Sequence, residues 1–374
     1  MHSRRRFLSR ACAATAAGAL PLALPVRALA AAETRRFEPG DGAWRTFEVT
    51  TRVELDPSAG AAQVWVPVPS VDSDWQRSLS TRFRSNGQAA LVHDGTQGAG
   101  MVHARFGPDT GAAMLEVTSL VRTRDRAVDW RSRGGVPDDA SLRAAWTRPT
   151  ALVPTDGLVR SAAQQAVGGA EGDVAKLRAI YEWVAANVDR EPSVRGCGEG
   201  DVKAMLQRGR PSGKCADINA LFVGMCRAVG IPARDLYGVR LAPSAFGYKE
   251  LGSASGSLAA AQHCRAEAYV QGHGWVAMDP ADVTKVMRQE TAQWIRSVDH
   301  PVVKPVHDKL FGCCEGNWMA YNDAHDLVLP GGDGKPLGFL MYPAALTAAG
   351  RLDSYAPDAF RYRIAAREIG GQAG

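Results

Sequence analysis

Three residues in this chain have types and positions that could carry out thiol chemistry. Cys215 lies in the segment 212–217, directly before an apolar repeat with helical spacing. His263 opens a strand-like run at 263–270, and Asp279 closes the next run, at 275–280. A thiol nucleophile needs a base that deprotonates it and a third group that orients the base. The three residues could supply these roles in the order Cys, His, Asp, which indicates an enzyme.

The expected position of Cys215 favours a reactive thiol. Apolar residues from 218 to 229 recur at three- and four-residue intervals, which predicts a helix, and Ser212 or Gly213 could be its N-cap. The positive end of a helix dipole favours thiolate over thiol. A buried structural cysteine or a disulfide partner remains the alternative from these residues alone.

The spacing of His263 and Asp279 fits a hairpin. The midpoint between them is residue 271, where the turn residues 271–274 begin. In an antiparallel pair they would then lie at or near opposite positions, with Cβ atoms ~5 Å apart. Asp279 could then fix the tautomer of His263 and stabilise the imidazolium. A register shift of one or two residues would break this pairing.

The elements around these residues indicate two kinds of structure. Alternating apolar residues predict strands at 47–55, 64–68, 101–106 and 114–122, which together suggest an all-β, sandwich-like module. From Leu142 the apolar period becomes helical, with helices expected at 174–188, 202–206 and 218–229 before the hairpin. A further helix at 291–297 and a last strand at 360–369 are also expected. The fold class is therefore α+β.

Several motifs in the middle of the chain resemble the transglutaminase-like superfamily, a branch of the papain-like thiol enzymes. The matching segments are 180–184, 213–217, 221–234, 263–267 and 274–280. The resemblance runs from about residue 150 to 285. It implies a papain-like core with Cys215 as nucleophile, His263 as base and Asp279 as the orienting residue. The family often has a tryptophan two residues after the histidine, where this chain has Arg265, so the substrate wall should differ.

The predicted organisation has four parts. Residues 1–30 are expected to be an export signal, 31–140 a β domain, 141–290 the catalytic core, and 291–374 a C-terminal extension with short strands. Arg4, Arg5 and Arg6 precede Phe7-Leu8 and an apolar stretch, and 28–30 has the small-x-small form of a cleavage site. The paired arginines resemble a twin-arginine signal, with an ordinary secretory signal or a basic tail as alternatives. The expected location is periplasmic or secreted.

The charge of the chain belongs largely to this signal. Its five arginines account for the net charge of +5, because their removal leaves 39 basic residues against 39 acidic ones. No basic footprint for nucleic acid remains in the mature chain. The apolar stretch is also shorter than the ~20 residues of a membrane span, so the prediction includes neither a nucleic-acid partner nor a membrane span.

Six cysteines follow the signal, and their pairing cannot be read from the sequence. Cys226 is expected to be a small core residue. His263 and Glu267 have a spacing that could suggest metal ligands on a helix, but the run 263–270 reads as a strand and no further pair completes a site. The prediction therefore includes no metal and no cofactor. For an oxyanion hole, the Cys215 N–H is the first candidate, and Gln207 could be a second donor or a surface residue.

The sequence thus predicts an exported thiol enzyme that attacks an amide carbonyl of a protein or peptide through a thioester. Hydrolysis, as in a peptidase or amidase, is favoured over transfer to an amine, which would make the enzyme a cross-linker. A non-catalytic scaffold or binding protein that retains the fold is the alternative from another class. The substrate and the oligomeric state are not determined by the sequence.

Overall fold

The computed structural model describes residues 35–132, 134, 139–253, 258, 260–356 and 359–370. The expected signal at 1–30 lies outside these residues and stays a prediction. Within the described part of the chain, no helix combines the length and the apolar character that a membrane crossing requires. The chain from Thr34 onward forms one compact unit.

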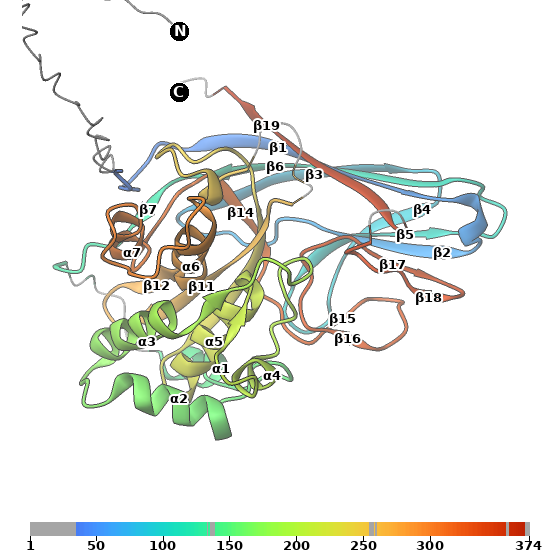
Figure 1. Cartoon of the computed structure of the whole chain (residues 1–374). Helices are drawn as coiled ribbons and strands as arrows, with labels where there is room; N and C mark the ends of the chain where they lie inside the picture. Colours follow the sequence, from blue (N-terminus) through green and yellow to red (C-terminus); the bar gives the residue numbers. More distant parts are fainter. Residues whose placement is uncertain are drawn as a thin grey trace, which may run out of the picture. The chain divides into compact units, whose positions relative to one another are not determined.

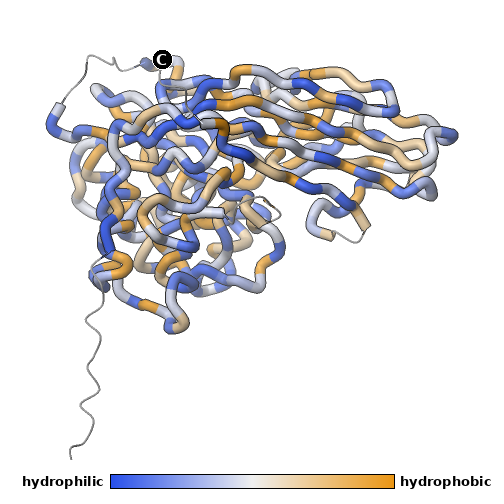
Figure 2. Tube along the Cα trace, turned by 90° about the horizontal axis from the view of Figure 1, so that it is seen from above, coloured by the Kyte–Doolittle hydropathy of each residue, from blue (hydrophilic) through white to orange (hydrophobic). Residues whose placement is uncertain are grey.

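Two antiparallel sheets form a β-sandwich in this unit (Figure 1). Every second side chain of β1 (Arg45–Leu55) is buried, and Figure 2 shows the same alternation of hydrophilic and hydrophobic residues along the long strands. The buried sides of the two sheets meet in one core, to which Val53 and Leu115 contribute from the first sheet and Val64 and Val102 from the second. The predicted sandwich-like module is therefore confirmed.

The order of strands within each sheet is as follows. The first sheet runs β19 (Arg361–Ile369), β1, β6 (Ala113–Thr123) and β3 (Gln76–Ser85). The second sheet runs β18 (Gly350–Arg351), β17 (Ala344–Thr347), β2 (Ala62–Pro67), β5 (Gly100–Phe106) and β4 (Gln88–His93). The sequence analysis missed β3 and β4 because most of their side chains are exposed, which removes the apolar alternation.

The last strands of the chain complete both sheets of the sandwich. The predicted final strand is confirmed as β19, which pairs with β1 from Thr46–Ile369 to Glu54–Arg361. β17 pairs with β2 in the second sheet. The C-terminal residues are therefore structural partners of the N-terminal strands, although more than 200 residues separate them in the sequence.

The second half of the fold is a four-stranded antiparallel sheet with a buried helix beside it. The sheet runs β12 (Gly274–Met278), β11 (Gln262–Val270), β10 (Ala233–Arg240) and β14 (Trp318–Asn322). Helix α5 (Cys215–Ala228) packs against β10 and β11, and all of its residues are buried. A helix that is buried on every side belongs to the centre of a core, and here that position fixes Cys215 next to the sheet.

The remaining helices and short strands complete the fold. The helices are α1 (Ala140–Trp146), α2 (Gly157–Val167), α3 (Asp173–Asn187), α4 (Val202–Leu206), α6 (Pro280–Gln289) and α7 (Lys304–Lys309), with 3₁₀ turns at Pro57–Ala59 and Lys249–Leu251. The short pairs are β8 (Asp189–Arg190) with β9 (Ser212–Gly213), β7 (Arg126–Ala127) with β13 (Cys313–Cys314), and β15 (Leu327–Val328) with β16 (Pro336–Leu337). α2, α3 and α6 pack directly against α5.

One expectation about the C-terminal third was wrong. Residues 291–297 are irregular rather than helical, and the helix of this region is α7. The polar and aromatic segment 317–326 contains the buried strand β14. β14 pairs with β10 and so extends the sheet that carries His263.

Candidate active site

Cys215 is the first residue of α5 and is buried. The expected N-cap was wrong, because Lys214 occupies that position rather than Ser212 or Gly213. The Asp217 carboxylate accepts the Lys214 N–H at 2.9 Å, which holds the first turn in place. The thiol therefore lies at the positive end of a fourteen-residue helix, where thiolate is favoured.

Asp217 also holds the loop that precedes α4. It accepts the N–H groups of Glu199 at 3.0 Å and Gly200 at 2.9 Å. Gly198 has a φ of +92°, and a Cβ at this position would lie 1.9 Å from the Asp217 carboxylate. Only glycine fits here. These contacts give Asp217 a structural role at the start of α5.

His263 on β11 and Asp279 after β12 form a direct hydrogen bond of 2.7 Å between Nε2 and Oδ2. The predicted register was wrong, because Ala266 pairs with Met278 and the hairpin is centred on residue 272. Asp279 is therefore displaced two positions from the residue opposite His263. The two groups still meet, because Asp279 leaves the strand as the N-cap of α6, where its Oδ1 accepts the Asp282 N–H at 3.1 Å.

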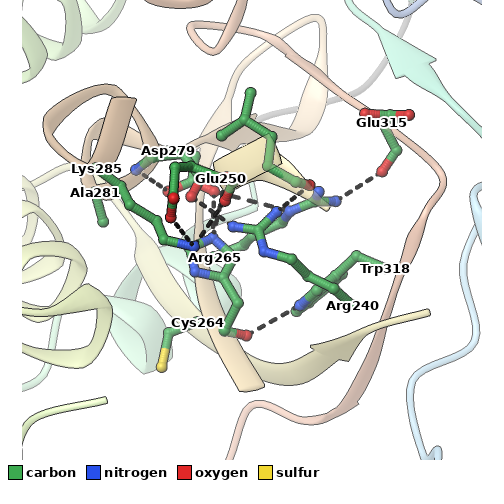
Figure 3. A network of polar contacts seen from close by, with 12 residues as sticks. Arg240, Glu250, Cys264, Arg265, Asp279, Ala281, Lys285, Glu315 and Trp318 are labelled. Atoms are coloured by element: carbon green, nitrogen blue, oxygen red, sulfur yellow. Dashed lines mark hydrogen bonds and ion pairs between the residues drawn. The ribbon is translucent and has the colours of Figure 1, made fainter. Parts of the chain in front are cut away.

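Buried charges around His263 favour its protonated form. Asp282 Oδ2 lies 3.4 Å from His263 Nε2, and Asp282 Oδ1 accepts a hydrogen bond of 2.5 Å from Arg240. Burial and Arg240 oppose protonation, but Asp282 and Asp279 outweigh them, so the pKa of His263 is raised. Figure 3 shows Arg240 in this network, together with Asp279, Lys285 and Glu250. Asp282 was not predicted, because its only signal in the sequence is its position three residues after Asp279.

The Cys215 thiol has the opposite tendency and loses its proton easily. Hydrogen bonds from the thiols of Cys197 and Cys264 and from His263 lower its pKa well below the ordinary value, although burial opposes this. Tyr342 donates a hydrogen bond of 3.1 Å to Cys197 Sγ. A low pKa at Cys215 and a raised pKa at His263 together favour a thiolate–imidazolium pair.

All six described cysteines are free thiols. Cys226 is fully buried in the core of α5, as predicted. Cys197 and Cys264 come from a loop and from β11, and the sequence contains no signal that would place them beside Cys215. Cys313 and Cys314 form the short strand β13, away from this cluster.

Arg265 has a structural position where the family often has tryptophan. Its Nη1 donates to the Glu315 carbonyl at 3.0 Å, its guanidinium lies 4.7 Å from the centre of the Trp318 ring, and its Nε lies 3.8 Å from Asp279 Oδ2. Figure 3 shows Arg265 between Asp279, Glu315 and Trp318. Trp318 in turn donates to the His263 carbonyl at 3.0 Å. Arg265 on β11 and Trp318 on β14 thus support the part of β11 that carries the histidine.

A pocket of about 550 Å³ contains both Cys215 and His263. Its aromatic lining is Tyr342, Tyr355 and Tyr362, which all come from the C-terminal extension. The sequence analysis did not assign any of these to the site. Gln207, the suggested oxyanion donor, is exposed at the end of α4 and does not line the pocket, whereas the buried Gln262 does.

His263, Asp279 and Asp282 are also a possible set of metal ligands, with ligand atoms within 4.8 Å of one another. Each of them already has a partner in the network, since Asp279 binds His263 and Asp282 binds Arg240. The buried guanidinium of Arg240 would also repel a cation placed between them. These contacts account for the cluster as an ion-pair network that orients His263.

Comparison with known proteins gives a consistent identification of the fold. Residues 160–280 match the family model of the transglutaminase-like superfamily. An uncharacterized protein of Haemophilus influenzae strain Rd is 32% identical over 330 residues, which cover 83% of this chain and 88% of that protein. The crystal structure of a candidate cysteine protease from Cytophaga hutchinsonii has a TM-score of 0.51 at 15% identity, over 87% of this chain and 99% of that chain. At that identity the likeness concerns the fold.

Proposed function

Because this chain belongs to the transglutaminase-like superfamily, we propose that it is an exported thiol enzyme that hydrolyses amide bonds of a protein or peptide. In this proposal Cys215 is the nucleophile, His263 the acid and base, and Asp279 the residue that orients His263. The main support is one observation. Cys215 and His263 line the same pocket, and the His263 Nε2 is held by Asp279 at 2.7 Å.

The reaction begins with the thiolate of Cys215 attacking the amide carbonyl carbon. When the C–N bond breaks, the His263 imidazolium gives its proton to the leaving amine, and a thioester remains on Cys215. Neutral His263 then removes a proton from water, whose oxygen attacks the thioester. The carboxylic acid is released and Cys215 returns as a thiolate beside protonated His263.

Two donors could stabilise the oxyanion that forms in each step. The Cys215 N–H lies in the first turn of α5, where N–H groups have no partner within the helix, and none of the described hydrogen bonds engages it. Gln262 lines the pocket, and its buried Nε2 has no hydrogen-bond partner among the described residues. An unpartnered amide donor beside the nucleophile suits the second position.

The experiment uses the processed chain and a glutamine-containing peptide, with and without methylamine. Release of ammonia and mass spectrometry of the peptide separate three outcomes, namely deamidation, backbone cleavage and transfer to the added amine. We expect hydrolysis of one of these amides, and loss of the reaction in Cys215→Ala. The matched control is Cys313→Ser, a cysteine outside the pocket, which should keep full activity.

Two results would contradict the proposal. Preferential incorporation of methylamine would identify an acyl transferase with the same nucleophile. A chain that reacts with no peptide, and whose Cys215 is alkylated by iodoacetamide no faster than a free cysteine, would be a binding protein that retains the fold.

A further inference from the structure

We propose that Arg190 and Lys214 form an anion subsite beside Cys215, which selects peptides with a free carboxylate close to the amide that is attacked. This inference rests on the proposed function, because it names the class of substrate for the same pocket. Both residues line the pocket that contains Cys215 and His263. The pocket volume of about 550 Å³ is in the range of small-molecule sites and admits a short peptide segment.

The position of Arg190 is set by two contacts. Arg190 on β8 is the register partner of Gly213 on β9, two residues before the nucleophile. Its Nε donates a hydrogen bond of 3.0 Å to the Gln289 side chain at the end of α6. The backbone pairing and this bond hold the guanidinium against the wall of the pocket.

Arg190 is buried, yet its charge has no counterpart in the described structure. Its exposed fraction is 8%, and its Nη1 is buried without a hydrogen-bond partner. Among the described residues, no carboxylate oxygen lies within ion-pair distance of Arg190, whose bonded side chain, Gln289, is neutral. A buried guanidinium without an anion is unfavourable, and a carboxylate entering the pocket would relieve this.

Lys214 is a second, half-buried cation on the lining of the pocket. Burial and the charge of Arg190 lower the pKa of Lys214, whereas the charges of Cys197, Cys215 and Glu191 act in the opposite direction. No described carboxylate forms an ion pair with Lys214. Two like charges on one pocket wall are unfavourable in the empty site and become favourable when an anion binds between them.

The other charged residues of the pocket balance one another. Lys285 donates to the Glu250 carbonyl at 2.7 Å, and its Nζ lies 3.3 Å from the Glu250 carboxylate. Cys215 and His263 carry opposite charges as a thiolate–imidazolium pair, and the rest of the lining, which includes the three tyrosines, is uncharged. The pocket therefore has an excess of positive charge at Arg190 and Lys214, next to the thiol.

The test compares alkylation of Cys215 by iodoacetate, which is an anion, and by iodoacetamide, which is neutral and similar in size. The alkylation rate with iodoacetate is divided by the rate with iodoacetamide, and this ratio is divided by the same ratio for N-acetylcysteine. The corrected ratio measures the attraction of an anion to the site. We expect this corrected ratio to be about 10 in the native chain, because a cleft lined by charges of one sign raises the local concentration of ions of the opposite sign by about this factor or more. Arg190→Gln and Lys214→Gln should each reduce it severalfold, and the double variant should bring it close to unity.

The matched control is Arg210→Gln, which removes an exposed arginine that pairs with Asp189, the neighbour of Arg190. This variant should leave the ratio unchanged. A corrected ratio of unity in the native chain, or an unchanged ratio in the double variant, would overturn the subsite. If the two cations only stabilise the thiolate, both reagents slow down together and the ratio does not move, which also overturns it.

A second measurement separates this inference from the proposed function. Binding of N-acetylglutamate to Cys215→Ala, measured by calorimetry, does not depend on the nucleophile. We expect binding that Arg190→Gln weakens about tenfold or more and Arg210→Gln does not. If N-acetylglutamate binds but iodoacetamide does not react with Cys215 in the native chain, the anion subsite is retained and the thiol mechanism is rejected. If Cys215 reacts but N-acetylglutamate does not bind, the thiol mechanism is retained and the anion subsite is rejected.

Discussion

Two sites in the described part of the chain bring a buried histidine close to a buried aspartate, and they differ in almost every property that matters for proton transfer. His263 and Asp279 are joined by a hydrogen bond of 2.7 Å. His325 Nε2 and Asp235 Oδ2 lie 3.8 Å apart, which is too far for a hydrogen bond. The Asp235 carboxylate has no hydrogen-bond partner among the described residues. Of the two histidines, only His263 lines the pocket that contains Cys215.

The electrostatic surroundings explain the difference. Around His263, Asp282 and Asp279 outweigh burial and Arg240, and the pKa of the histidine is raised. Around the second pair, burial dominates. It lowers the pKa of His325 to about 3 and raises that of Asp235 to about 7. Burial is the largest influence on both groups and keeps the histidine and the aspartate neutral, and closely placed charges are needed to make an acid–base pair of them.

The largest effect should come from removing the two histidines in turn. His263→Gln should lower kcat/KM by about 10³- to 10⁴-fold, because the substitution removes the acid and base. His325→Gln should keep activity within a fewfold of the native value. Steady-state kinetics on a peptide that reacts in the experiment described above gives kcat/KM for both variants. Similar losses of kcat/KM in the two variants would mean that the difference between the two histidine–aspartate pairs has no bearing on catalysis.

Asp279→Asn should lower kcat by about 10²- to 10³-fold, because an amide cannot fix the histidine tautomer or stabilise the imidazolium. It should leave the circular dichroism spectrum unchanged, since the side-chain oxygen that caps α6 is retained. The matched variant Asp235→Asn should be fully active. If Asp279→Asn retains its turnover, Asp279 has no role in orienting His263.

The second pair should reveal itself through the pH dependence of stability. Between about pH 4.5 and 6.5, His325 is protonated and Asp235 is ionised in the unfolded chain, whereas in the folded chain His325 is neutral and Asp235 carries the proton. The pair therefore binds one proton in both states, and folding neither takes up nor releases a proton at this pair. In Asp235→Asn only His325 remains. The unfolded state then binds the extra proton, and the free energy of unfolding should fall by about 2 kcal/mol, relative to the native chain, as the pH decreases through this window.

The reciprocal variant should have the opposite sign. In His325→Gln the folded state holds the extra proton, on Asp235, and stability should fall by about 2 kcal/mol relative to the native chain as the pH rises from 4.5 to 6.5. Urea denaturation at several pH values measures both slopes. Two variants with the native pH profile would show that the pair is not neutral in the folded chain.

The smallest effect concerns the thiols beside the first pair. Cys197→Ala removes the hydrogen bond that contributes most to the low pKa of Cys215, so that pKa should rise. The pH profile of alkylation by iodoacetamide should move to higher pH, with a severalfold loss of rate at neutral pH. Cys313→Ser is the control and should keep the native profile. An unchanged profile in Cys197→Ala would leave Cys264, His263 and the helix terminus as the main causes of the low pKa of Cys215.

Much of the site could be predicted because its signals are local. The helix after Cys215 follows from apolar spacing, and the strands that carry His263 and lead to Asp279 follow from alternation and a glycine turn. The His263–Asp279 contact was expected for a partly wrong reason, since the register differs by two positions and the N-cap of α6 restores the contact. The boundaries at 140 and 290 remain predictions, and the sandwich includes strands from both ends of the chain.

By itself, the sequence determined the periodicity of the main elements and the identity of the three residues whose chemistry fits a thiol enzyme, because these depend on neighbours along the chain. Only the tertiary structure decided what surrounds them. Asp282, Arg240, Arg190 and the tyrosines of the C-terminal extension reach the site from separate elements. Their effect on His263 and Cys215 depends on distance and burial, and neither quantity is written in the order of residues.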